Sequence, residues 1–188
     1  MRRRPLQLAS ASVLIAAGVM LTACTPSAPE PEPTRTPSAT PSATPTPSAE
    51  PSGEPAPTPL GIACDELVTL QAMYDFNPNF SLLASWSPEA GTAARAALDA
   101  EGVACRWQND TSGDTIDVSA AILDETALAA KQAEAASGTS ASYGWFRVAG
   151  GAGEAIAFDG STWLVVRSVW FSSPADAQQL VEAALSSL

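Results

Sequence analysis

The sequence contains no histidine and only one lysine, Lys131. The absence of histidine excludes Ser-His-Asp and Cys-His catalysis, zinc sites built on imidazole, and pH switching by an imidazole group. Lys131 lies in the middle of an expected helix and is interpreted as a solvated side chain, so a serine nucleophile lacks a base. Gly150, Gly151 and Gly153 lack the strand–turn–helix context of a dinucleotide fingerprint. No cofactor and no metal ion is therefore expected.

Positive charge is also scarce. The chain has a formal net charge of -11, from 9 basic and 20 acidic residues. From Cys24 onward it has 6 basic and 20 acidic residues, a net charge of -14. Such a surface repels phosphate backbones and anionic headgroups, so nucleic acid is not an expected partner and charge alone does not bind the protein to a membrane.

The N-terminus has the pattern of an export signal. Three arginines, Arg2 to Arg4, precede an apolar stretch from 6 to 21 that is too short for a membrane span. Leu21-Thr22-Ala23-Cys24 resembles the lipobox of bacterial lipoproteins. The resemblance implies cleavage after a signal peptide over 1–23 and a diacylglycerol on Cys24, which would anchor the protein on the extracytoplasmic face of the cell membrane. An ordinary secretory signal ending near a cysteine is the alternative.

A proline-rich spacer follows over 24–59. Residues 25–59 hold twelve of the sixteen prolines, and threonine, serine, alanine and glutamate fill most other positions. This composition cannot form a core and predicts a disordered tether, about 100 Å long if it adopts polyproline II throughout. It also permits O-glycosylation, although a passive tether is the favoured interpretation.

Residues 60–188 are long enough for one globular domain. We predict an α+β fold with an antiparallel sheet of about five strands packed against helices, in the order α-α-β-β-α-β-β-β-α. Phe80 and Leu82 are interpreted as anchors of a loop. The strand beginning at Thr162 is apolar on both faces except at Arg167 and Ser168, which is typical of a central strand. The predicted helices cover 65–73, 92–100, 124–136 and the residues after 173, and the predicted strands cover 103–108, 115–123, 143–149, 154–158 and 162–171.

Two further cysteines, Cys64 and Cys105, remain once Cys24 is assigned to the lipid. An exported chain lies in an oxidising compartment, so we expect them to form one disulfide. This bond would join the start of the first helix to the first strand.

Four segments of the domain resemble a group of small actinobacterial cell-surface lipoproteins. They are Cys64-Asp-Glu-Leu-Val, Tyr74-Asp-Phe-Asn-Pro-Asn-Phe, Gly102-Val-Ala-Cys-Arg-Trp and Phe158-Asp-Gly-Ser-Thr-Trp. The resemblance covers most of the chain, including the lipobox and the paired cysteines. It implies a fold and a cell-surface location but no activity, because that group has no assigned catalytic residues.

Aromatic and arginine side chains are the candidate ligand-binding groups. An aromatic platform could stack on a sugar, and several guanidinium groups on one face could bind an anion. The alternatives are that the tryptophans fill the core and that the arginines pair with nearby acids or aromatic rings. The candidates are Trp145, Trp163, Trp170, Arg106, Arg147 and Arg167.

Two classes of function are consistent with these features. The first is a non-catalytic binding or scaffold module that recognises a cell-wall glycan or an envelope protein. The second is a small extracytoplasmic hydrolase that uses two carboxylates, which requires a cleft with carboxyl groups about 5–10 Å apart. The absence of a recognisable catalytic motif favours the first.

Overall fold

The computed structural model describes residues 56–188. The predicted signal peptide, Cys24 and most of the predicted spacer lie outside the described residues. The elements are, in chain order, α1 (Cys64–Leu67), α2 (Leu70–Phe76), β1 (Phe80–Leu82), α3 (Ala93–Asp99), β2 (Val103–Asn109), β3 (Thr115–Ile122), α4 (Glu125–Ala135), β4 (Thr139–Ala141), β5 (Gly144–Ala149), β6 (Ala152–Asp159), β7 (Thr162–Ser168) and α5 (Pro174–Leu185).

The strands form one antiparallel sheet in the order β1-β2-β3-β7-β6-β5-β4. β7 is the middle strand, as its apolar sequence predicts. Its side chains are buried on both faces of the sheet, with Leu164 and Val166 on one face and Trp163 and Val165 on the other. The α+β class and the antiparallel sheet are therefore as expected.

The number of strands and the order of elements differ from the prediction. The sheet has seven strands, not about five, because β1 and β4 were not expected. Phe80 and Leu82 belong to β1, where they pair with the end of β2, and not to a loop. Three residues are too few to show a period of two, and β4 is a short, largely exposed Thr-Ser-Ala segment. The expected first helix is also divided, since Val68 is extended and Thr69 caps α2.

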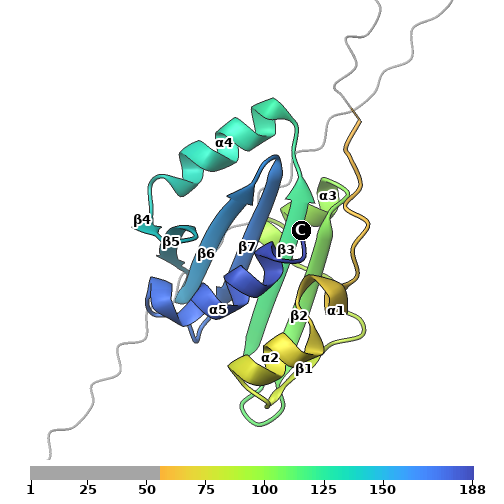
Figure 1. The fold of residues 1–188 in the computed structure, drawn as a ribbon, viewed down its shortest axis with the longest axis vertical. Helices are drawn as coiled ribbons and strands as arrows, with labels where there is room; N and C mark the ends of the chain where they lie inside the picture. Colours follow the sequence, from red (N-terminus) through yellow and green to blue (C-terminus); the bar gives the residue numbers. More distant parts are fainter. Residues whose placement is uncertain (1–55) are drawn as a thin grey trace, which may run out of the picture. The chain divides into compact units, whose positions relative to one another are not determined.

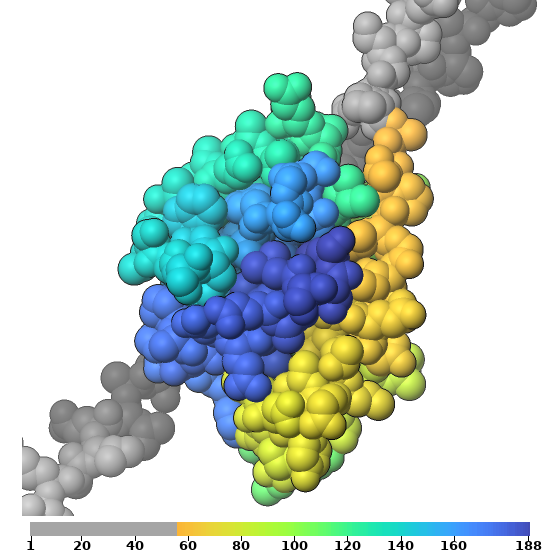
Figure 2. Space-filling model, in the orientation of Figure 1, coloured from red at the N-terminus to blue at the C-terminus, as the bar shows by residue number. Residues whose placement is uncertain are grey.

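One face of the sheet is covered by α1, α2 and α5 (Figure 1). Figure 2 shows this face, with α5 in dark blue beside the yellow segment that contains α1 and α2. The apolar stripe of α5, which includes Leu180 and Val181, packs here against Leu164 and Val166 of β7. This is the larger of the two cores.

The opposite face carries α3 and α4. Its smaller core joins small side chains, such as Ala97 of α3 and Ala135 of α4, to Ile156, Trp163 and Val165 of the sheet. Alanine lets α3 approach the sheet closely, and neither helix covers the area between them. This gap contains the cleft described below.

The ends of the helices and hairpins have well-known capping and turn chemistry. Asp124 caps α4 by accepting hydrogen bonds from the backbone N–H groups of Thr126 and Ala127 at 2.8 and 2.9 Å. Asp176 accepts from the backbone N–H of Ser173 at 2.8 Å, and Pro174 is the first residue of α5. The β5–β6 hairpin turns at two glycines with positive φ, which other residues rarely adopt.

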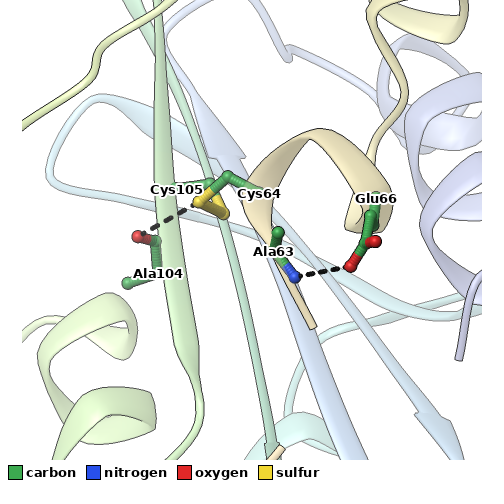
Figure 3. The surroundings of a disulfide bond; sticks show 5 residues. All are labelled: Ala63, Cys64, Glu66, Ala104 and Cys105. Carbon is green, nitrogen blue, oxygen red and sulfur yellow. Dashed lines mark hydrogen bonds between the residues drawn. A yellow bond between two sulfur atoms is a disulfide. The ribbon is translucent and has the colours of Figure 1, made fainter. Parts of the chain in front are cut away.

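The expected disulfide joins Cys64 at the start of α1 to Cys105 of β2, with a Cα–Cα distance of 5.5 Å (Figure 3). Because β1 precedes β2 in the chain, the bond reaches the second strand and not the first. Next to it, Glu66 accepts a hydrogen bond from the backbone N–H of Ala63 at 3.0 Å. Thr58, near the end of the predicted spacer, pairs with Ile122 as an isolated β-bridge.

Candidate functional site

A row of charged side chains crosses the face of the sheet that α3 and α4 leave partly open. Each member is paired directly with the next across neighbouring strands, so all five side chains project from the same face. Their charges alternate in sign along the row. In strand order from β2 to β5 the row, called here the charged row, is Arg106, Asp117, Arg167, Glu154 and Arg147.

Both carboxylates of the charged row are fully engaged. Arg106 donates from Nε and Nη2 to the two oxygens of Asp117 at 2.6 and 2.7 Å. Glu154, which is only 8% exposed, accepts from Nε of Arg147 at 2.7 Å and from Nε of Arg167 at 3.2 Å, one on each oxygen. Every carboxylate oxygen of the row therefore already faces a guanidinium group.

Each end of the row is held by a residue from outside the sheet. The guanidinium of Arg106 stacks on the ring of Trp86, 4.0 Å from its centroid. Arg147 donates to Glu134 of α4 at 2.8 Å, and this hydrogen bond lowers the pKa of Glu134 against the opposing effect of partial burial. Burial disfavours the charged form of Arg147, but its two carboxylate partners outweigh this and its pKa is raised.

The charged row lies in the floor of a cleft of about 970 Å³ between α3 and α4. On the α3 wall Arg95 pairs with Asp99 at 2.6 Å, and this hydrogen bond is the main cause of a raised pKa at Arg95. On the α4 wall the ammonium of Lys131 lies 4.7 Å from the centroid of the Trp163 ring. The volume lies within the usual range for small-molecule sites, about 300–1,000 Å³.

The cleft contains every basic side chain of residues 56–188 and is itself neutral. Five acidic residues line it beside five basic ones, so the other eleven acidic residues of the described domain lie elsewhere on its surface. The acidic residues in the cleft are separated by cations, and nowhere in residues 56–188 do three Asp, Glu, Cys or His residues gather closely enough to hold a metal ion. The five basic residues are Arg95, Arg106, Lys131, Arg147 and Arg167.

The six predicted ligand-binding residues divide into three groups. Arg106, Arg147, Arg167 and Trp163 line the cleft. Trp145 belongs to the core on the same face, where its ring packs edge-on against Phe158 with centroids 5.8 Å apart.

Trp170 lies apart from the cleft. Its indole Nε1 donates to Asp114 at 3.0 Å and lowers the pKa of that carboxyl, while its ring packs against Phe80. The structure thus brings together four of the six candidates. It also shows the arginine–acid and arginine–aromatic pairs that the alternative interpretation expects.

Several residues of the site were not predicted from the sequence. Asp117 and Glu154 were visible as isolated charges within otherwise apolar strands, and this signal could have identified them. Trp86 comes from an irregular segment between β1 and α3, and no local pattern places it against Arg106. Ser119, on the cleft floor, is indistinguishable in the sequence from any other serine in a strand.

Comparison with known proteins does not assign this arrangement to a family. The chain matches no protein-family model, and no curated protein or solved structure is significantly similar to it. Within residues 56–188 no helix has the length and apolarity needed to cross a lipid bilayer.

Proposed function

We propose that the protein is an exported lipoprotein, anchored to the outer face of the cell membrane through Cys24, whose domain binds a ligand without catalysis. The observation that carries the binding function is the gathering of all five basic side chains of the described domain in one neutral cleft. Ion pairing alone does not require this, because acidic residues are available over the whole surface. A recognition surface does require several donors in one place.

Fixed side chains support binding in preference to chemistry. The charged row is held by ion pairs, by stacking on Trp86 and by Glu134 of α4, so its donors keep their positions when a ligand enters. Pre-ordered donors reduce the entropy that a protein loses on binding.

A hydrolase is the second candidate, because Asp117 and Glu154 flank one strand. They lie two strands apart, which places their Cα atoms roughly 9–10 Å from each other at the usual strand spacing. Carboxyl groups at such separations cleave glycosides in other proteins. Here, however, a guanidinium group occupies each carboxylate oxygen, so neither side chain has an oxygen free to contact a substrate. The hydrolase would be favoured if the wild-type protein released reducing ends from cell-wall glycan and the Asp117→Asn variant did not.

The anchor is tested independently of the domain. The Cys24→Ser variant of the full chain should move from the membrane fraction to the culture medium, or keep its signal peptide, whereas the wild-type chain should carry a diacylglycerol by mass spectrometry. An unlipidated wild-type N-terminus would show that the lipobox resemblance is misleading. Neither result depends on the cleft.

Binding is tested with the full chain purified from membranes in detergent and incubated with isolated cell-wall material. We expect retention by the wild type and a loss of at least half of the retained protein in Arg106→Gln. Tyr74→Ala is the control, because Tyr74 is 62% exposed on α2, which covers the opposite face of the sheet. Equal retention of all three proteins would exclude the cleft as the binding surface, provided that their melting temperatures are similar.

A further inference from the structure

The geometry points to a ligand that is recognised through a single carboxylate group, bound between the guanidinium of Arg167 and the hydroxyl of Ser119. This inference rests on the proposed binding function and names its ligand chemistry. It follows from one loosely held arginine, one hydroxyl on the cleft floor, and the charge balance of the ion pairs around them.

Arg167, at the centre of the charged row, is the least tightly held of its three arginines. Its contacts are 3.2 Å to Glu154 and 3.5 Å to the carbonyl of Ala149, whereas the hydrogen bonds of Arg106 and Arg147 to carboxylates are 2.6–2.8 Å. Asp117 lies opposite Arg167 in the sheet but gives both of its oxygens to Arg106.

A guanidinium has five N–H groups, so three of those on Arg167 have no acceptor among residues 56–188. The side chain is 34% exposed and lines the cleft. Free donors on an ordered arginine are suited to a planar, two-oxygen anion.

Ser119 supplies a second donor on the cleft floor. It is only 2% exposed overall and lines the cleft. A hydroxyl at this position can donate a hydrogen bond to an acceptor that enters the cleft. Ser119 pairs with Val165 of β7, which makes it a diagonal neighbour of Arg167. Diagonal neighbours have Cα atoms about 7–8 Å apart, so both donors can reach the oxygens of one carboxylate.

The charge balance selects a ligand with one negative charge. The ion-paired charges on the floor and the α4 wall comprise four cations and three carboxylates, an excess of one positive charge among them. The residue that makes the cleft as a whole neutral is Glu89, which takes part in none of these pairs. One carboxylate neutralises this excess. A phosphate dianion would add a second negative charge beside Glu154, in a domain whose remaining surface carries eleven acidic residues. The cations are Arg106, Lys131, Arg147 and Arg167, and the carboxylates are Asp117, Glu134 and Glu154.

The floor also limits the size of the ligand. Arg167, Val165 and Trp163 follow one another along the cleft face of β7 and span roughly 13 Å at about 3.3 Å per residue. This length fits a short peptide or a disaccharide. The carboxylate could accordingly come from the C-terminus of a peptide or from an acidic sugar.

Isothermal titration of the full chain in detergent tests the inference. The probes are N-acetyl-alanyl-alanine and its C-terminal amide, glucuronic acid and glucose, and inorganic phosphate. We expect at least one of the two acids to bind, and its neutral counterpart to bind roughly tenfold or more weakly, as loss of a charge-assisted hydrogen bond predicts. The peptide acid and the sugar acid distinguish the two sources of the carboxylate.

Variants then locate the carboxylate. Arg167→Gln and Ser119→Ala should each weaken binding of the preferred acid, by roughly tenfold and severalfold respectively. The control is Ser140→Ala, an exposed serine of β4 that should bind like the wild type. If Arg167→Gln does not fold, Arg167→Lys preserves the charge without the planar fork and should bind with intermediate affinity.

The inference would be overturned by tighter binding of phosphate than of either acid, by equal binding of an acid and its neutral counterpart, or by unchanged affinity in Arg167→Gln. Absence of binding by both acids at millimolar concentration would also overturn it. Retention on cell-wall material would then still support the proposed function with another ligand chemistry. Loss of that retention as well would remove the proposed function itself.

Discussion

Replacing Glu154 with glutamine should reveal how much of the stability of the sheet depends on the charged row. Glu154 is nearly buried and bridges Arg147 and Arg167 from the strand between them. Glutamine keeps the volume of the side chain but removes its charge, and it turns an amide N–H2 group toward one of the two guanidinium groups. Arg147 keeps Glu134 as a partner, whereas Arg167 keeps only the carbonyl of Ala149 at 3.5 Å.

The expected cost lies between those of buried and exposed ion pairs. Removing one partner of a fully buried pair costs about 3–5 kcal/mol, and an exposed pair contributes at most about 1 kcal/mol. The side chains of Arg147 and Arg167 are 30% and 34% exposed, so water partly replaces the lost carboxylate. We therefore expect Glu154→Gln to lower the free energy of unfolding by about 2 kcal/mol.

Urea unfolding at pH 7, followed by tryptophan fluorescence with the disulfide intact, measures this difference. The matched control is Asp99→Asn, which removes an ion pair between half-exposed side chains on α3 and should change the midpoint very little. A midpoint shift in Glu154→Gln no larger than that of Asp99→Asn would refute the view that the row is a structural network. An unchanged m-value is required for the comparison.

Three further predictions concern the disulfide, Tyr143 and the cap of α4. The Cys64–Cys105 bond closes a loop of 41 residues, so reducing it should lower the free energy of unfolding by roughly 4 kcal/mol. Urea titrations with and without dithiothreitol measure this difference, and the double serine variant should show none. Tyr143 donates a hydrogen bond from its hydroxyl to the carbonyl of Pro174, and burial raises its pKa to about 12. The unfolded chain therefore ionises first, so the free energy of unfolding should fall as the pH rises from about 10 to 12. Tyr143→Phe should not show this fall. Asp124→Ala should cost about 1 kcal/mol by thermal or urea unfolding through loss of the α4 cap, and a value near zero would contradict the capping role.

The strongly patterned parts of the fold were predictable from the sequence. The central strand is apolar on both faces, the caps of α4 and α5 have local signatures, and the two domain cysteines have only one pairing. β1 and β4 escaped prediction because each has three residues and depends on a neighbouring strand for its conformation. Long-range pairing outweighs local propensity in such short segments.

The site was less predictable than the fold. Arg106, Arg147 and Arg167 were each identifiable as charges within strands, but only the register places them in one row. That register depends on the pairing of β3 with β7, which are separated in the sequence by α4 and three other strands. Trp170 shows the opposite case, because it lies in the turn just after β7 and its side chain contacts Phe80 and Asp114 instead of the cleft. Residue type alone therefore could not separate the cleft from the rest of the sheet.

Structural pairing and ligand binding are compatible roles for the arginines. Asp117 and Glu154 hold Arg106 and Arg147 by short hydrogen bonds and leave Arg167 positioned but with free donors. A guanidinium fixed from one side loses less conformational entropy when an anion approaches from the other. Because the rest of the domain is acidic, the neutral cleft is also the region where an anionic group meets the least repulsion. The same ion pairs that stabilise the sheet would then define where a carboxylate binds.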